Sequence, residues 1–208
     1  GLGKLQRAVL EALTGHRELN YHGGMISDEA MPLIERNILT RVTTGTALGG
    51  AALPARAAAS RQIRWRPVSH THHHATLAAI DNFVAINATL AVDLNGQCVS
   101  DALNGRQVSG VGGLVDFQRG ALASAGGRPI IALAATTPDG SVSRIVPRLD
   151  GTTVSIARAD AGIVVTEFGV ADCRDLDLDA RAQALITIAA PQHRDGLANE
   201  WDRLRRAM

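Results

Sequence analysis

Four short apolar segments constrain the fold of this chain more than any other feature of its sequence. They are bounded by turn-forming residues and cover Phe83–Ile86, Leu90–Leu94, Pro129–Ala135 and Ile163–Thr166. Segments of this length are typical of sheet strands, and the second and third are apolar enough to be buried on both faces. Helical periodicity of apolar residues precedes them over 5–13 and follows them over 179–189, where Pro191 ends it. The alternation predicts an α/β fold in a single domain covering residues 1–208.

The composition argues against several classes of function. The chain has 208 residues, a formal net charge of +1 and only 3% aromatic residues, so neither nucleic acid nor an aromatic stacking platform is expected. No apolar run approaches the roughly 18–20 residues of a membrane span. Cys98 and Cys173 lie far apart without a CxxC partner, which predicts reduced thiols in the cytoplasm. The start, Gly-Leu-Gly-Lys, has no initiator Met and no signal-peptide core, which indicates a piece of a longer chain.

A glycine-rich run lies in the middle of the chain, at Gly105–Phe117. Within it, Gly110, Gly112 and Gly113 separate a polar turn from an apolar segment. Glycine permits positive φ and lets a ligand approach main-chain N–H groups, which can form an anion nest or an oxyanion hole. The same spacing is also found in a tight turn between two elements, so spacing alone leaves both interpretations open.

Several blocks of sequence follow one another in a recognisable order. They are Gly1–Gly3 with 8–10, His22 with Met25–Asp28, Phe83–Asn87, Val92–Gln97, Gly105–Phe117, Gly126–Ile131, Ser143–Arg148 and Val165–Asp172. Together they resemble the C-terminal domain of the acetyl-CoA hydrolase/transferase family, a branch of the class I CoA-transferases. The resemblance implies a CoA-transferase-like α/β fold with an open, mostly parallel sheet flanked by helices. It also implies that the family's N-terminal half, a partner domain, is absent from this chain.

The resemblance also implies a chemistry. In this family acyl-CoA is a substrate, no cofactor or metal is permanently bound, and a small carboxylate or water accepts the acyl group. A glutamate attacks the thioester and forms an anhydride and then a glutamyl-CoA thioester, which divides one difficult step into easier ones. By the same resemblance Gly1 and Gly3 belong to a turn of the CoA site, and Gly110, Gly112 and Gly113 hold the thioester. A homo-oligomer is compatible with the family.

The chain departs from the family at the nucleophile. The family segment is of the type His-Thr-Glu-Met-Ile-Ser-Asp, whereas this chain reads His22-Gly-Gly-Met-Ile-Ser-Asp28. Gly24 therefore stands at the position of the glutamate and cannot form an anhydride. Three explanations stay open: loss of CoA transfer, thioester hydrolysis by a directed water, or a carboxylate supplied from elsewhere. The last two predict an enzyme, and the first predicts a non-catalytic protein that binds CoA or only pairs with its N-terminal half.

Three polar residues of the apolar blocks are candidates for chemistry. Glu167 follows the strand predicted over 163–166, at the strand end where open α/β sheets bind ligands, and is our first candidate for a general base. A structural carboxylate that accepts backbone hydrogen bonds is an equal alternative. Asn87 closes the strand predicted over 83–86 and is a candidate donor to a carbonyl, with a turn-forming asparagine as the alternative. Asp116 follows the glycine run and is not expected to act directly.

Histidines and arginines form the remaining polar clusters. His70-Thr-His-His-His74 lacks the fixed spacing and the carboxylate or thiolate of a zinc site, so we expect a solvated loop there. His22 is a candidate catalytic base or hydrogen-bond donor beside Gly24, and a structural imidazole is its alternative. Arg203, Arg205 and Arg206 are expected on a solvated helix face.

Overall fold

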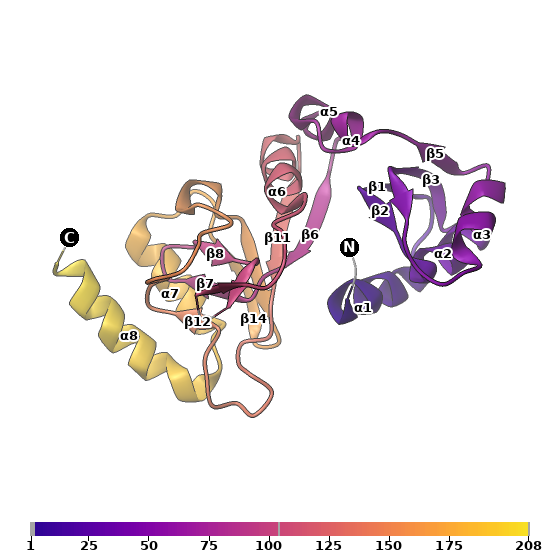
Figure 1. Ribbon diagram of the computed structural model, residues 1–208. Helices are drawn as coiled ribbons and strands as arrows, with labels where there is room; N and C mark the ends of the chain where they lie inside the picture. Colours follow the sequence, from indigo (N-terminus) through magenta and orange to yellow (C-terminus); the bar gives the residue numbers. More distant parts are fainter. Residues whose placement is uncertain (1–2, 104, 208) are drawn as a thin grey trace. The chain divides into compact units, whose positions relative to one another are not determined.

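The computed structural model describes residues 3–103 and 105–207, which form two compact units, 1–77 and 78–208 (Figure 1). Each unit has its own hydrophobic core. The prediction that residues 1–208 act as a single domain stays a prediction, although the contacts within the chain divide it near Leu77. Within the described residues, no helix is long and apolar enough to cross a membrane.

The first unit is built on a three-stranded, wholly parallel sheet in the order β1-β3-β5. Its strands are β1 (Leu19–His22), β3 (Leu39–Thr44) and β5 (Ile63–Trp65), with a short parallel pair of β2 (Met25–Ile26) and β4 (Thr46–Ala47). Its helices are α1 (Lys4–Ala12), α2 (Met31–Glu35), α3 (Leu53–Ala59), α4 (Val68–Thr71) and α5 (His74–Ala78), with 3-10 turns at Leu13–Gly15 and Asp28–Ala30. None of these three main strands is among the four apolar segments of the sequence, because polar residues interrupt each of them.

The core of the first unit lies between the sheet and its helices. Pro32 and Pro54 stand in the first turns of α2 and α3, where a missing backbone N–H costs nothing. The buried core residues are Ile26, Ala30, Met31, Leu33, Ile34, Ile38, Leu39, Val42, Leu53, Ala57 and Ile63. Leu13, at the end of the predicted amphipathic segment, and Leu10 pack against this cluster.

The second unit contains a four-stranded sheet in the order β14-β13-β11-β6. Its strands are β6 (Val84–Ala88), β11 (Arg128–Ala132), β13 (Ile163–Thr166) and β14 (Gly169–Asp172). The first three are parallel neighbours, and β14 returns antiparallel beside β13. A second sheet, β12-β7-β8, consists of β7 (Ala91–Asp93), β8 (Cys98–Val99) and β12 (Ile145–Val146), followed by a β9 (Ala102–Leu103) and β10 (Arg106–Gln107) hairpin. The expected α/β class with mostly parallel strands is confirmed.

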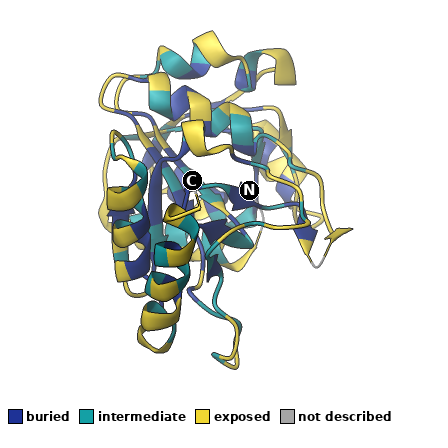
Figure 2. Ribbon diagram, turned by 90° about the vertical axis from the view of Figure 1, so that its left-hand side faces the viewer, coloured by how far each residue is buried: buried dark blue, intermediate teal, exposed yellow. Residues whose placement is uncertain are grey.

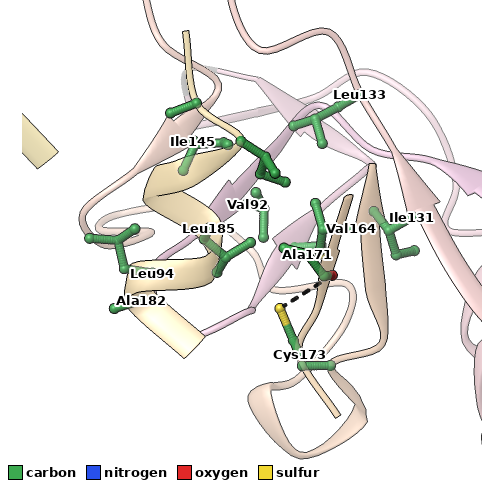
Figure 3. Close-up of a cluster of buried hydrophobic side chains, with 14 of the residues drawn as sticks. Val92, Leu94, Ile131, Leu133, Ile145, Val164, Ala171, Cys173, Ala182 and Leu185 are labelled. Atoms are coloured by element: carbon green, nitrogen blue, oxygen red, sulfur yellow. Dashed lines mark hydrogen bonds between the residues drawn. The ribbon is translucent and has the colours of Figure 1, made fainter. Parts of the chain in front are cut away.

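Helices cover the strands of the second unit. They are α6 (Leu114–Ala123), α7 (Leu178–Thr187) and α8 (Pro191–Arg205), with a 3-10 turn at Arg158–Asp160. Helix α6 packs on β11 and β6, and α7 packs on β14 and α8. Residues from both sheets and from α7 meet in one core around Val92, Ile131, Val164 and Leu185 (Figure 3). Figure 2 shows buried residues concentrated in the strands, with exposed residues along the outer sides of the helices.

Two expectations are refined in the second unit, and a third is confirmed. The apolar segment 90–94 is a strand, but it lies in the second sheet, apart from the other three. Pro191 does end the preceding helix, yet it also begins α8, because proline is well suited to a first helical turn. Cys98 and Cys173 are buried free thiols as expected, and burial raises the pKa of the Cys173 thiol to about 11.

Candidate functional site

The carboxyl edge of the parallel sheet in the first unit brings two distant segments together. Strands β1 and β5 both run parallel to the central β3, so the residues that follow them emerge at the same edge. His22–Gly24 follows β1, and the histidine-rich segment follows β5. Open α/β sheets bind ligands at this edge. The arrangement was missed from the sequence because β1, β3 and β5 were not recognised as strands.

The imidazole of His72 covers the backbone of Gly24. A Cβ added to Gly24 would lie 2.7 Å from His72 Cε1 and 3.1 Å from His72 Nε2. The Nδ1 atom on the other side of the ring is 2.9 Å from Thr71 Oγ1, and Thr71 is fully buried. The predicted nucleophile position is therefore occupied by a ring from another segment, which a side chain at residue 24 would displace.

His22 lies two residues before Gly24 and contacts Thr71, the last residue of α4. Its Nε2 atom lies 3.0 Å from the carbonyl oxygen of Thr71. Burial lowers the pKa of His22, and His70 and His72 lower it further, against the Thr71 carbonyl, which raises it. The His70 ring centroid is 6.1 Å from that of His22. His22 is thus a positioned, preferentially neutral imidazole, compatible with either role predicted for it.

The ring of Tyr21 lies close to the backbone of Gly23. A Cβ there would lie 2.7 Å from the hydroxyl oxygen of Tyr21. Tyr21 Oη donates to the carbonyl of Met25 at 2.6 Å, and burial raises the pKa of Tyr21 to about 12. Both residues that distinguish this chain from the family pattern, Gly23 and Gly24, therefore lie under aromatic or imidazole rings.

The expectation of a solvated loop over residues 70–74 is wrong. The segment contributes to two short helices, α4 and α5, and His70 and His72 are half-buried. Only His73 and His74 are exposed. The half-burial comes with contacts of Thr71 to His22 and of His72 to Gly24, tertiary contacts that no local pattern shows. Among the described residues, no group of three or more His, Cys, Asp or Glu side chains is placed to hold a metal ion.

The glycine run of the second unit has open surroundings. A Cβ added to Gly110 or Gly112 would meet no atom within 4 Å, and Gly112 has φ +59°. Gly113 is the N-cap of α6 and makes no side-chain capping bond. No described residue accepts a hydrogen bond from the N–H groups of residues 110–113. These N–H donors are compatible with both interpretations of the sequence, the tight turn and the anion nest, because a turn before a helix leaves such groups unpaired.

Asn87 lies within β6, opposite Ile131 of β11, one residue before the strand ends. Its Nδ2 atom is buried and has no hydrogen-bond partner among the described residues. Strand β6 packs against α6, the helix that the glycine run precedes. A buried donor without an acceptor is costly, so this amide is a candidate for ligand contact.

Glu167 stands where the sequence predicts, immediately after β13, in the turn to β14. The side chain is exposed, and Oε2 accepts a hydrogen bond from the backbone N–H of Ala135 at 2.9 Å. This contact corresponds to the structural alternative of the sequence analysis. Its role as a base stays a prediction.

The remaining predicted residues are Gly1, Gly3, Asp116 and the arginines of α8. Gly3 is the N-cap of α1 with φ +118°, while Gly1 lies outside the described residues. Asp116 is exposed in the first turn of α6. Arg203 and Arg205 pair with Glu200 and Asp202 on the exposed face of α8, as expected for a solvated helix face.

Comparison with known proteins decides the family. A family model described as the acetyl-CoA hydrolase/transferase C-terminal domain matches residues 49–201, more than half of the chain. The chain belongs to the acetyl-CoA hydrolase/transferase family. The matched range begins after Gly24, so the region around His22 and Gly24 is related to known proteins only through the longer alignments.

Those longer alignments extend over nearly the whole chain. The 4-hydroxybutyrate coenzyme A transferase of Clostridium kluyveri is 37% identical over 211 residues, covering 97% of this chain and 49% of that protein. The succinyl-CoA:cyclohexane-1-carboxylate CoA transferase of Geobacter metallireducens is 37% identical over 216 residues, covering 99% and 49%. The crystal structure of RipA from Yersinia pestis matches with a TM-score of 0.92 at 36% identity, covering 99% of this chain and 48% of that one. This member of the acetyl-CoA hydrolase/transferase family thus spans about half the length of these relatives.

Proposed function

We propose that this chain is the C-terminal half of an acyl-CoA hydrolase or transferase, and that it cleaves a CoA thioester by attack of water. In this proposal the N–H groups of residues 110–113 hold the thioester, with acyl-CoA as the substrate and no permanently bound cofactor. The N-terminal half typical of the family is its partner. Relatives named as CoA transferases and the family's description as hydrolases and transferases support this class of reaction.

The observation that carries the binding step is the open glycine run. Four consecutive N–H groups have no acceptor among the described residues, and the space over Gly110 and Gly112 is empty. Main-chain donors aimed at a developing oxyanion contribute about 3–4 kcal/mol each to transition-state stabilisation. The buried, unpaired Nδ2 of Asn87 adds a further donor in the same unit.

The choice of water over a covalent route follows from Gly24. A residue without a side chain cannot form an acyl anhydride, and the neighbouring volume is taken by the His72 ring. Asp28, the nearest carboxylate in the sequence segment, already accepts a hydrogen bond from the N–H of Gly50 at 2.7 Å. We therefore infer that position 24 does not carry a covalent intermediate in this protein.

The test is release of CoA thiol from acetyl-CoA by the full-length protein, with and without a carboxylate acceptor. Hydroxylamine trapping and mass spectrometry of the peptide containing residues 21–28 accompany it. We expect thiol release without an acceptor and no modified carboxylate. An adduct on Asp28, or release that depends strictly on an added carboxylate, would contradict the proposed route.

A non-catalytic CoA-binding protein is the second candidate. The hydrogen bond that Glu167 accepts from the Ala135 N–H favours this second candidate, because it gives the carboxylate at the end of β13 a structural role. This candidate predicts calorimetric binding of CoA esters by the full-length protein and no thiol release above the uncatalysed rate.

A further inference from the structure

The four-stranded sheet of the second unit has its helices on one face. A Cβ added to Gly162, directly before β13, would lie 2.5 Å from Gln118 Nε2 of α6. A Cβ added to Gly169 of β14 would meet the end of α7 at 3.2 Å. Side chains alternate between the two faces of a sheet and paired residues share a face, so both glycines lie on the face that carries Val164. Helices α6 and α7 therefore cover the same face.

The opposite face of this sheet, here called the open face, carries apolar side chains from all four strands. They are Val84 and Ile86 of β6, Ile130 of β11, Val165 of β13 and Val170 of β14. Val84 is 48% exposed and Val170 is 66% exposed, and the other three are half-buried. In the described part of the chain, none of the five belongs to a hydrophobic core of either unit. Parallel sheets of α/β proteins are covered on both faces, so the open face is a candidate docking surface.

Strand β6 adds a free backbone edge to this face. It is an end strand of the sheet and pairs with β11 alone. The Phe83 carbonyl accepts a hydrogen bond from the N–H of Arg128 at 2.8 Å, toward β11. Successive residues of a strand direct their backbone groups to opposite sides, so Val84, Ile86 and Ala88 direct theirs away from β11. Among the described residues, no hydrogen bond engages these N–H and C=O groups, and such an edge can pair with a further strand.

We propose that the open face and the free edge of β6 together form the docking surface for the N-terminal half of the full-length protein. In this arrangement that half supplies a strand to β6 and apolar side chains to the open face. The lengths of the relatives favour this occupant: the alignments cover 97–99% of this chain but only 48–49% of each relative, so about as much chain again lies outside the matched part. The inference rests on the partner named in the proposed function, and it does not depend on thioester hydrolysis.

Photo-crosslinking of the full-length protein identifies the occupant. The photoreactive residue p-benzoylphenylalanine replaces Val170, or Val142 as a matched control. Val142 is 57% exposed and lies in the connection between β11 and β12. After irradiation, mass spectrometry should find a peptide of the N-terminal half joined to position 170, with much less joined to position 142. A link from position 170 to residues 1–208 of the same chain or of a second copy, no link, or equal linkage at both positions would overturn the proposal.

Hydrogen exchange tests the edge of β6 in the unmodified full-length protein. The amides of Ala85 and Asn87 face β11, and they provide the internal reference for a strand that is paired on one side. If a strand docks on the other side, the amides of Val84, Ile86 and Ala88 should exchange as slowly as these two. Fast exchange at the three outward amides beside slow exchange at the two reference amides would overturn the proposed strand addition.

A charge on the open face provides an independent readout. Val170→Asp should lower the melting temperature of the full-length protein by about 5 °C or more, whereas Val142→Asp should stay within about 2 °C of the wild type. Equal melting temperatures would leave the face in solvent and reject docking. Light scattering should give the same mass for Val170→Asp and the wild type, and a halved mass would make a second copy the occupant. None of these measurements reads turnover, so an inactive protein would reject hydrolysis and leave this inference standing.

Discussion

The two glycine motifs of this molecule use the same residue for opposite purposes. At Gly23 and Gly24 a missing side chain lets the rings of Tyr21 and His72 approach the backbone. At Gly110 and Gly112 no atom lies within 4 Å of an added Cβ, and the main-chain donors are left open. The first motif is closed by the protein itself, whereas the second is available to a ligand. Glycine in a functional segment therefore identifies a close approach, but the fold decides whether a ring or a ligand makes it.

The largest effect is expected when a carboxylate side chain is introduced at Gly24. The double variant Gly24→Glu, His72→Ala removes the imidazole ring and places a carboxylate at position 24. The backbone of Gly24 is outside the left-handed region, so it can carry a side chain. We expect the double variant of the full-length protein to acquire a hydroxylamine-trappable acyl adduct that the wild type lacks. Gly24→Glu alone should acquire less of it, because the His72 ring must first move. Equal labelling of the single and double variants would show that the ring does not block the position.

The open motif is tested with Gly110→Val. A Cβ at this position has no atom of the described residues within 4 Å, and the backbone of Gly110 does not have positive φ, so the fold should survive while access to the N–H groups is lost. We expect acyl-CoA affinity to fall at least about tenfold, or about 1.4 kcal/mol, by calorimetry. Gly112→Val is a less clean variant, because φ +59° adds backbone strain to the same steric effect. The control is Gly196→Ala in α8, which also meets no atom and should leave affinity unchanged.

The two glycine motifs should also differ in how much an added methyl group lowers the free energy of unfolding. Gly23→Ala places a Cβ against Tyr21, whose hydroxyl is fixed on the Met25 carbonyl, so we expect a loss of about 1–3 kcal/mol in unfolding free energy. Gly110→Ala should stay within about 0.5 kcal/mol of the wild type, as substitutions without such contacts do. Urea denaturation of both variants checks the difference. Equal destabilisation would mean that Gly23 is not sterically required.

The smallest effect is expected at Glu167. Glu167→Gln retains an oxygen that accepts from the Ala135 N–H, so the turn after β13 keeps its contact. Because this contact gives the carboxylate a structural role, kcat of the full-length protein should stay within about threefold of the wild type, far from the 10²–10⁴-fold fall that follows loss of a base. A fall of that larger size would identify Glu167 as the base of the proposed hydrolysis.

Part of the fold of the second unit was predictable because three of its strands overlap short apolar segments of the sequence. The segment 163–166 coincides with β13, and 83–86 and 129–135 overlap β6 and β11. Burial on both faces leaves a continuous apolar run that can be recognised without an alignment. The strands of the first unit contain polar residues among the apolar ones, and the same inspection did not detect them. Because these strands were not predicted, the sheet edge at which His22, Gly24 and His72 meet was not predicted either.

The sequence by itself determined the α/β class, the family, the glycine at position 24 and the position of Glu167 after its strand. These depend on local composition and on the order of motifs along the chain. Only the tertiary structure decided that His72, 48 positions beyond Gly24 in the numbering, covers that glycine. The physical reason is the parallel pairing of β1 and β5 with β3, which brings the residues after distant strands to one edge of the sheet. A histidine that resembles an ordinary loop residue in the sequence becomes a positioned imidazole because of that pairing.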